Sequence, residues 1–176
     1  MRSSSHELVE APNSTFSEAY LGNVDRVFGF LAYRVQSKHQ AEDLTQVVFE
    51  KALRAWHRFE PGKSSVTTWL MAIAKNVLVD DFRRRKETLM GDEEVHALLD
   101  HQSVAPPDAS ISPGLARALA GLKPKEQTVL ALRFGGDLKG SEIGELLGMS
   151  TDNVHQILSR SLRRLRDTLE APPQDA

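Results

Sequence analysis

The 176-residue sequence contains no cysteine. Disulfide bridges and thiolate metal sites are therefore excluded, and nothing in the sequence points to an oxidising compartment. No apolar run approaches the roughly 20 residues that a membrane-spanning helix needs. The stretch Met1–Asn13 is polar and lacks the apolar middle of a signal peptide. We therefore expect a soluble protein of the cytoplasm.

The sequence also has little net charge. Its formal net charge of -2 would by itself argue against a nucleic-acid partner. The charges are segregated, however, because four basic residues are consecutive at 83–86 and only arginines carry charge within 160–166. A phosphate backbone responds to charge within a Debye length of about 8–10 Å, so the local clusters matter more than the mean. The segment 91–114 contains no lysine or arginine. Its acidic residues are Asp92, Glu93, Glu94, Asp100 and Asp108.

Apolar residues recur at helical spacing through most of the chain. The runs 16–35, 38–58 and 65–86 each place apolar side chains three and four residues apart, and no long alternating strand pattern is present. Helical signals resume near Gly114 and continue to Pro172. The pattern predicts an all-α fold of two small helical domains joined by a flexible acidic linker. We place a disordered N-terminus at 1–14, the first domain at 15–88, the linker at 89–113, the second domain at 114–171 and a tail at 172–176.

The stretch Gly140–Ser159 has the pattern of a helix-turn-helix. Gly144 is a small residue where the two helices approach, and Gly148 stands where the turn needs a positive φ. Ser150 is a good N-cap for the second helix. A helical hairpin that binds no DNA would share this pattern. If the second helix is a recognition helix, the residues that face DNA are Thr151, Asp152, Asn153, His155, Gln156, Ser159, Arg160, Arg163 and Arg164.

The first domain resembles region 2 of bacterial sigma factors. The run Ala41–Phe49 is similar to the polymerase-docking helix of that region, and Trp69–Asn76 with the following arginine cluster resembles the helix that reads the −10 element. The second domain is similar to region 4, which reads the −35 element. A short linker and the lack of other regions match the ECF (extracytoplasmic-function) subgroup over residues 16–170. The resemblance implies a factor that binds core RNA polymerase, recognises both elements and helps to melt the promoter.

The resemblance also implies roles for individual residues. Core polymerase would contact a polar stripe that contains Asp43, Gln46, Val47 and Glu50. In this family the loop that corresponds to Phe59–Val66 receives a flipped non-template base. The residues that would contact the −10 element are Lys63, Ser64, Ser65, Thr67, Thr68, Lys75, Asn76, Val79, Arg83, Arg84 and Arg85. The implied partners are core RNA polymerase, promoter DNA and an anti-sigma factor, with no membrane insertion and with association to the nucleoid in the holoenzyme.

Two positions depart from the family pattern. ECF recognition helices often carry a Gly-Thr-Val-Lys-Ser-Arg-like run, where this chain has the residues 152–157, Asp-Asn-Val-His-Gln-Ile. The −35 preference is therefore open, and we expect lower affinity there. Lys139 replaces the usual Ser or Thr cap, which predicts that the first helix of the helix-turn-helix frays.

Two other classes of function are alternatives to this interpretation. An enzyme or metalloprotein has little support, because His96 and His101 in the acidic segment lack helical support and the pair Asp80-Asp81 adjoins arginines. No nucleophile–base set or phosphate loop is present, so we expect no catalysis, metal or cofactor. An autonomous helix-turn-helix transcription regulator is the alternative. It would leave the run Ala41–Phe49 and the basic third helix unexplained.

Overall fold

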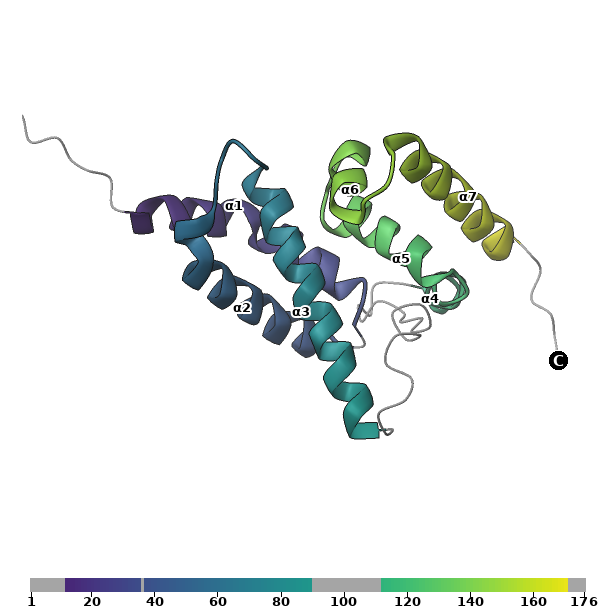
Figure 1. Cartoon of the computed structure of the whole chain (residues 1–176). Helices are drawn as coiled ribbons and strands as arrows, with labels where there is room; N and C mark the ends of the chain where they lie inside the picture. Colours follow the sequence, from purple (N-terminus) through teal and green to yellow (C-terminus); the bar gives the residue numbers. More distant parts are fainter. Residues whose placement is uncertain (1–11, 36, 90–111, 171–176) are drawn as a thin grey trace, which may run out of the picture.

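The structure, a computed structural model, describes residues 12–35, 37–89 and 112–170 (Figure 1). Every regular element in these ranges is helical, which confirms the all-α prediction. The N-terminal unit contains α1 (Pro12–Ala32), α2 (Lys38–Ala55), the short η1 (Trp56–Arg58) and α3 (Val66–Leu89). The C-terminal unit contains α4 (Pro113–Ala120), α5 (Pro124–Leu130), the π-helical turn η3 (Ala131–Gly135), α6 (Gly140–Leu147) and α7 (Thr151–Glu170).

Short polar side chains set the starts of several helices. Ser37 accepts a hydrogen bond from the backbone N–H of Gln40 at 3.1 Å and begins α2. Ser65 accepts one from the N–H of Thr68 at 3.1 Å and begins α3. Each hydroxyl satisfies a backbone donor that has no partner within its helix. Proline stands in the first turns of α1, α4 and α5, where its missing N–H is not needed.

The apolar stripes predicted from the sequence form the core of the N-terminal unit. Helices α1, α2 and α3 pack against one another around side chains with almost no exposed surface. Trp69 and Ile73 are half-buried against this core. The fully buried members include Val27, Phe30, Leu31, Val48, Leu70, Met71 and Val77.

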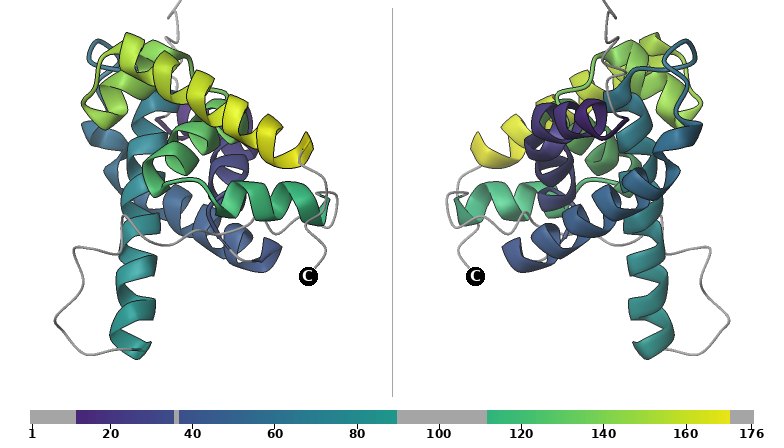
Figure 2. Two further views of the ribbon diagram at one scale, coloured as in Figure 1. Left: turned by 90° about the vertical axis from the view of Figure 1, so that its right-hand side faces the viewer. Right: turned by 90° about the vertical axis from the view of Figure 1, so that its left-hand side faces the viewer.

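The two units share one core, although the sequence predicts two domains on a flexible linker. Leu132, Leu138 and Ile143 of the C-terminal unit belong to the same buried cluster as the core of α1, α2 and α3. Figures 1 and 2 show the two groups of helices side by side, and η3 packs against α1. A smaller cluster lies beneath α7, at Ala118, Leu119, Leu122, Leu130 and Leu165. Each unit alone is small and buries little apolar surface, which favours their association.

The backbones of α1 and η3 approach each other closely. A Cβ atom added at Gly135 would lie 2.5 Å from the carbonyl oxygen of Gly29, and a Cβ at Gly29 would meet the carbonyl of Gly135. Next to this contact, a Cβ at Gly136 would lie 3.1 Å from Cε of Met71 in α3. No residue larger than glycine fits at Gly29 or Gly135 without separating the helices.

We predict that Gly29→Ala separates the two units and leaves each unit folded. The added methyl group overlaps the η3 backbone, which costs about 1–3 kcal/mol for overpacking. Alanine also favours the helical conformation of α1. The radius of gyration from small-angle scattering should rise, while the helical circular dichroism stays unchanged.

Gly22→Ala is the matched control, because it lies in the same helix and a Cβ there meets nothing within 4 Å. It should stabilise α1 by up to about 1 kcal/mol and keep the protein compact. Equal radii of gyration for the two variants would contradict the proposed role of the glycine contact.

Candidate functional site

The predicted helix-turn-helix is confirmed by α6, its turn and α7. Gly148 adopts φ 64°, the left-handed conformation that the turn needs. The N–H of Met149 donates to the carbonyl of Gly144 at 2.9 Å, and a Cβ at Gly144 would lie 2.6 Å from the carbonyl oxygen of Met149. Ser150 accepts a hydrogen bond from the N–H of Asn153 at 3.2 Å and caps α7. The angle between α6 and α7 therefore depends on two glycines and one serine.

The start of α6 is capped by a residue that the sequence reasoning overlooked. The carboxylate of Glu142 accepts a hydrogen bond from the backbone N–H of Lys139 at 2.8 Å. This is one half of a capping box, and it does not need a hydroxyl at the N-cap. The structure therefore does not support the expectation that Lys139 makes α6 fray. The signal was a glutamate three residues after the cap.

The predicted DNA-facing residues of α7 lie on its exposed side. Val154, Ser161 and Leu165 are buried, and every residue predicted to face DNA is exposed. Within the described residues Arg160 and Arg163 form no ion pair, whereas Arg164 pairs with Glu126 of α5 at 3.0 Å. The exposed set is Thr151, Asp152, Asn153, His155, Gln156, Ser159, Arg160, Arg163 and Arg164. Arg164 is therefore the member whose charge is already compensated within the protein.

His155 is held against the start of α6. A Cβ at Gly140 would lie 2.5 Å from Nε2 of His155, so the imidazole covers the space that the glycine leaves open. A side chain at position 140 would displace the ring. Gly140 thus positions a recognition-helix residue, which could not be foreseen without the angle between α6 and α7.

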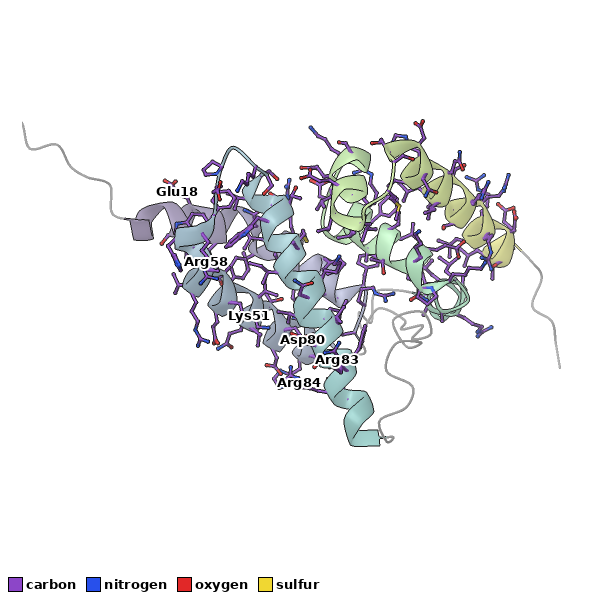
Figure 3. The ribbon with its side chains drawn as sticks, viewed as in Figure 1. Glu18, Lys51, Arg58, Asp80, Arg83 and Arg84 are labelled. Carbon is purple, nitrogen blue, oxygen red and sulfur yellow. The ribbon has the colours of Figure 1, made fainter. Side chains whose placement is uncertain are left out.

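A pocket lies between α1 and the loop that precedes α3. The loop contributes Ser64 and Ser65, and α1 contributes Glu18 and Asn23. Trp56 and Phe59 also line it, with their rings stacked at a centroid distance of 5.2 Å and an interplanar angle of 16°. Glu18 is labelled on α1 in Figure 3. The sequence pointed to the loop but not to α1, which is distant in the chain.

Several hydroxyls predicted to contact DNA are used within the protein. Ser65 caps α3, and its Oγ lies 2.9 Å from Oγ1 of Thr68. Thr68 is buried, and its hydroxyl supports the loop. Thr67 donates from Oγ1 to Oδ1 of Asn23 at 2.6 Å and ties α3 to α1. Ser64 lines the pocket without such a role.

The cationic side chains of α3 and its loop have different surroundings. Lys63 is exposed and pairs with Glu60 at 2.8 Å. Lys75 is half-buried against the C-terminal unit, where Nζ donates to the carbonyl of Leu146 at 3.4 Å. Arg85 pairs with Asp81 at 2.9 Å, and Arg84 lies 4.0 Å from the same carboxylate.

Asn76 and Arg83 are exposed on α3, and Val79 between them is half-buried. Arg83 makes no ion pair within the described part of the chain, so it is the member of the arginine cluster that is open to a phosphate. Figure 3 shows Arg83 and Arg84 toward the far end of α3, near Asp80. Asp80 itself pairs with Lys51 of α2 at 3.3 Å.

The predicted docking stripe is exposed on α2. Asp43 lies 3.6 Å from Nδ1 of His39, and Gln46 donates to Glu50 at 3.1 Å. Val47 is half-buried. The stripe adjoins an apolar groove between α1 and α2, which the sequence did not reveal. The apolar residues that line this groove are Phe16, Tyr20, Val24, Phe28, Phe49 and Leu53, and the polar ones are Asp25, Lys38, Glu42, Thr45, Gln46 and Glu50.

The residues weighed for metal binding, His96 and His101 with their acidic neighbours, lie outside the described residues. Among residues 12–35, 37–89 and 112–170, no group of three His, Asp or Glu side chains is placed to hold a metal ion. No helix in these ranges is long and apolar enough to cross a membrane.

Comparison with known proteins identifies the family. Residues 19–88 match the Sigma-70 region 2 family, and residues 118–167 match Sigma-70, region 4. The chain is 31% identical over 165 residues to the ECF RNA polymerase sigma factor SigX of Bacillus subtilis, covering 89% of this chain and 84% of SigX. The chain belongs to the ECF RNA polymerase sigma factors. As a sigma factor it binds core RNA polymerase and directs it to promoters.

Two solved structures share the fold of this ECF sigma factor. The RpoE–NepR complex from Bartonella quintana, a sigma factor with its anti-sigma factor, gives a TM-score of 0.69 at 19% identity, over 90% of this chain and 98% of RpoE. CnrH in complex with the cytosolic domain of CnrY gives 0.61 at 19% identity, over 90% and 89% of the two chains. The alternative of an autonomous regulator is not favoured.

We predict that Arg163 and Arg164 contribute unequally to DNA binding by the sigma factor. Arg163→Ala removes a free cation, so the slope of log K against log salt for initial promoter binding should fall by about 1. Arg164→Ala removes a cation already paired with Glu126 and should change the slope by clearly less. Titrations of holoenzyme at several salt concentrations measure both slopes, and equal losses would contradict this assignment.

Proposed function

We propose that the sigma factor docks on core polymerase through α2. The observation that supports this is the exposed stripe Asp43, Gln46 and Glu50 beside an apolar groove. Tyr20 is 41% exposed and Leu53 is 51% exposed at this groove, which is high for large apolar side chains. Acidic and apolar surface together suit a basic amphipathic helix of a partner. Val47 contributes apolar contact at the edge of the stripe.

The pocket beside the loop is proposed to hold a base from the melted −10 strand. An extruded base needs an aromatic surface for stacking and polar groups for its edge. Trp56 and Phe59 supply the rings, and Ser64 supplies a polar group. Lys63, Asn76, Val79 and Arg83, with Arg84 and Arg85 at the end of α3, would follow the strand away from the pocket. Ser65 and Thr67 hold the loop and α3 in place for this task.

The exposed face of α7 is proposed to enter the major groove at the −35 element. Asn153 and Gln156 carry amides that can read base edges, and Arg160 and Arg163 follow along the same helix toward the phosphates. Thr151 and Ser159 offer smaller contacts. His155, held against Gly140, fills the place of a basic residue that is common in the family.

The remaining features of the proposal follow from this role. The protein acts by binding and is not an enzyme, and it works without a metal or a cofactor. It resides in the cytoplasm and joins the nucleoid as part of holoenzyme. The sigma factor RpoE of Bartonella quintana, which has a similar fold, was captured with the anti-sigma factor NepR, and this supports an anti-sigma partner for this chain.

Reversal of charge on the α2 stripe should weaken polymerase binding. The double variant Asp43→Lys with Glu50→Lys should lower core affinity by about tenfold or more, because like charges then meet across the interface. Fluorescence titration with core polymerase measures this, with circular dichroism to check the fold. Glu145→Lys with Glu170→Lys changes the net charge equally at exposed sites outside the stripe and should have little effect. Unchanged core affinity in the first variant would refute the docking surface.

Asn76→Ala should impair promoter melting and leave initial binding within about twofold, because a captured base contributes only after it leaves the stack. Gln156→Ala is the matched control, since it removes an exposed amide from α7 and should weaken initial binding without altering the bubble of bound complexes. Permanganate footprinting reads the melted region. A normal bubble with Asn76→Ala would remove this residue from the strand-capture site.

A further inference from the structure

The two DNA-binding surfaces are too close together for promoter binding. The −35 and −10 elements are centred about 25 base pairs apart, or about 85 Å at roughly 3.4 Å per base pair. In the structure α3 contacts α6, and Lys75, to which the family resemblance gives a −10 contact, donates to the carbonyl of Leu146. The structure is therefore a closed form. The chain between Leu89 and Ser112 can extend to about 75–80 Å, so it permits the units to separate.

Two further polar contacts bridge the units, besides the glycine contact, the shared apolar core and the hydrogen bond from Lys75 to Leu146. Arg26 of α1 pairs with Asp137 beyond η3 at 3.0 Å, in an exposed position where an ion pair contributes little. Arg34, near the end of α1, donates from Nη1 to Oε1 of Gln127 in α5 at 2.6 Å. The second contact is buried, because Arg34 is 4% exposed and Gln127 is 6% exposed.

Arg34 is a buried charge that lacks a counter-ion among the described residues. No carboxylate of the described residues lies within ion-pair distance of it, and its Nε–H is buried without an acceptor. Burial lowers the pKa of Arg34 to about 10, so the guanidinium is still charged at neutral pH. A buried charge with only a neutral partner is unfavourable, because the hydrogen bond does not replace the lost hydration.

The surroundings of Gln127 explain why its position does not hold a carboxylate. Its Nε2 donates to the carbonyl of Leu119 at 3.0 Å and to that of Leu122 at 3.1 Å. A glutamate at position 127 would place an unprotonated carboxylate oxygen against these two carbonyl oxygens. The amide nitrogen of Gln127 satisfies these two carbonyl groups near the end of α4. Its Oε1 is left as the acceptor for Arg34.

We propose that Arg34 is a conformational control residue that weakens the closed form of the sigma factor. Apolar burial and the fit of Gly29 to Gly135 hold the two units together, and the desolvation of the Arg34 guanidinium opposes them. When the units separate, Gln127 leaves Arg34 and water can reach the charge. This unfavourable desolvation keeps the free energy of opening small, so that core polymerase can bind the open form. The functional part of this inference rests on the proposed function, whereas the conformational part does not.

The conformational part is tested on the free protein. Because the chain has no cysteine, Leu21→Cys and Asp167→Cys give two unique exposed labelling sites, one on each unit. Energy transfer between dyes at these sites reports closure. Arg34→Met and Arg34→Gln remove the charge, and the closed-to-open ratio should rise by about tenfold in both. Arg34→Lys keeps a charge at this position and should not raise it.

A ratio that is unchanged or lower in both neutral variants, with native circular dichroism, would overturn the proposal. So would an equal rise in Arg34→Lys, because loss of the charge could not then be the cause. Two neutral variants of different polarity are used so that misfolding of one leaves the other to decide.

The functional part is tested with core polymerase. Core affinity falls in proportion to the fraction of open protein, so Arg34→Met should bind core up to about tenfold more weakly. Adding Gly29→Ala, which opens the closed form, should restore the affinity. The link to polymerase would be refuted if Arg34→Met increased the closed fraction without weakening core binding. It would also be refuted if adding Gly29→Ala did not restore core affinity. If the unaltered protein itself fails to bind core, the proposed docking function is wrong, while the energy-transfer result still judges Arg34.

Discussion

The arrangement of this sigma factor depends on the close backbone contact between α1 and η3. Gly29 and Gly135 let the two helical segments approach to a distance that excludes a Cβ atom. This approach brings Leu132 and Leu138 into the same cluster as the core of the N-terminal unit. The positions of α3 and α6 relative to each other follow, because each is packed on its own unit. This backbone contact, together with the shared core, thus sets the distance between the two proposed DNA-binding surfaces.

The closed form combines favourable and unfavourable burial at one interface. Apolar side chains leave water when the units meet, which stabilises the contact in proportion to the buried area. Arg34 leaves water at the same time and gains only a neutral acceptor. Stability in proteins is a small difference between large opposing contributions, so a single buried charge can shift such a balance. This sigma factor must separate its two units to bind a promoter. An interface in which a buried charge opposes apolar burial makes that separation easier.

The pocket beside the loop shows how fold and recognition share the same side chains. Asn23 accepts a hydrogen bond from Thr67 and also lines the pocket. Ser65 caps α3 and also borders the pocket. Trp56 and Phe59 are held by packing against Trp69, at centroid distances of 5.9 and 5.3 Å. The groups that would meet a base are therefore oriented before the base arrives, which reduces the entropy lost on capture.

The sequence by itself determined the helices, the helix-turn-helix and the family. These features depend on residues within one or two helical turns, such as the cap at Ser150, the left-handed glycine at 148 and the exposed stripe of α2. Only the tertiary structure decided which charges are free and which residues build the sites. Arg164 is compensated by Glu126 from another helix, Thr68 is buried, and Asn23 reaches the pocket from α1. The contact of Arg34 with Gln127 joins residues 93 positions apart. No local sequence pattern encodes such a pair. The two side chains meet only because the packing of the two units buries both of them at the same interface.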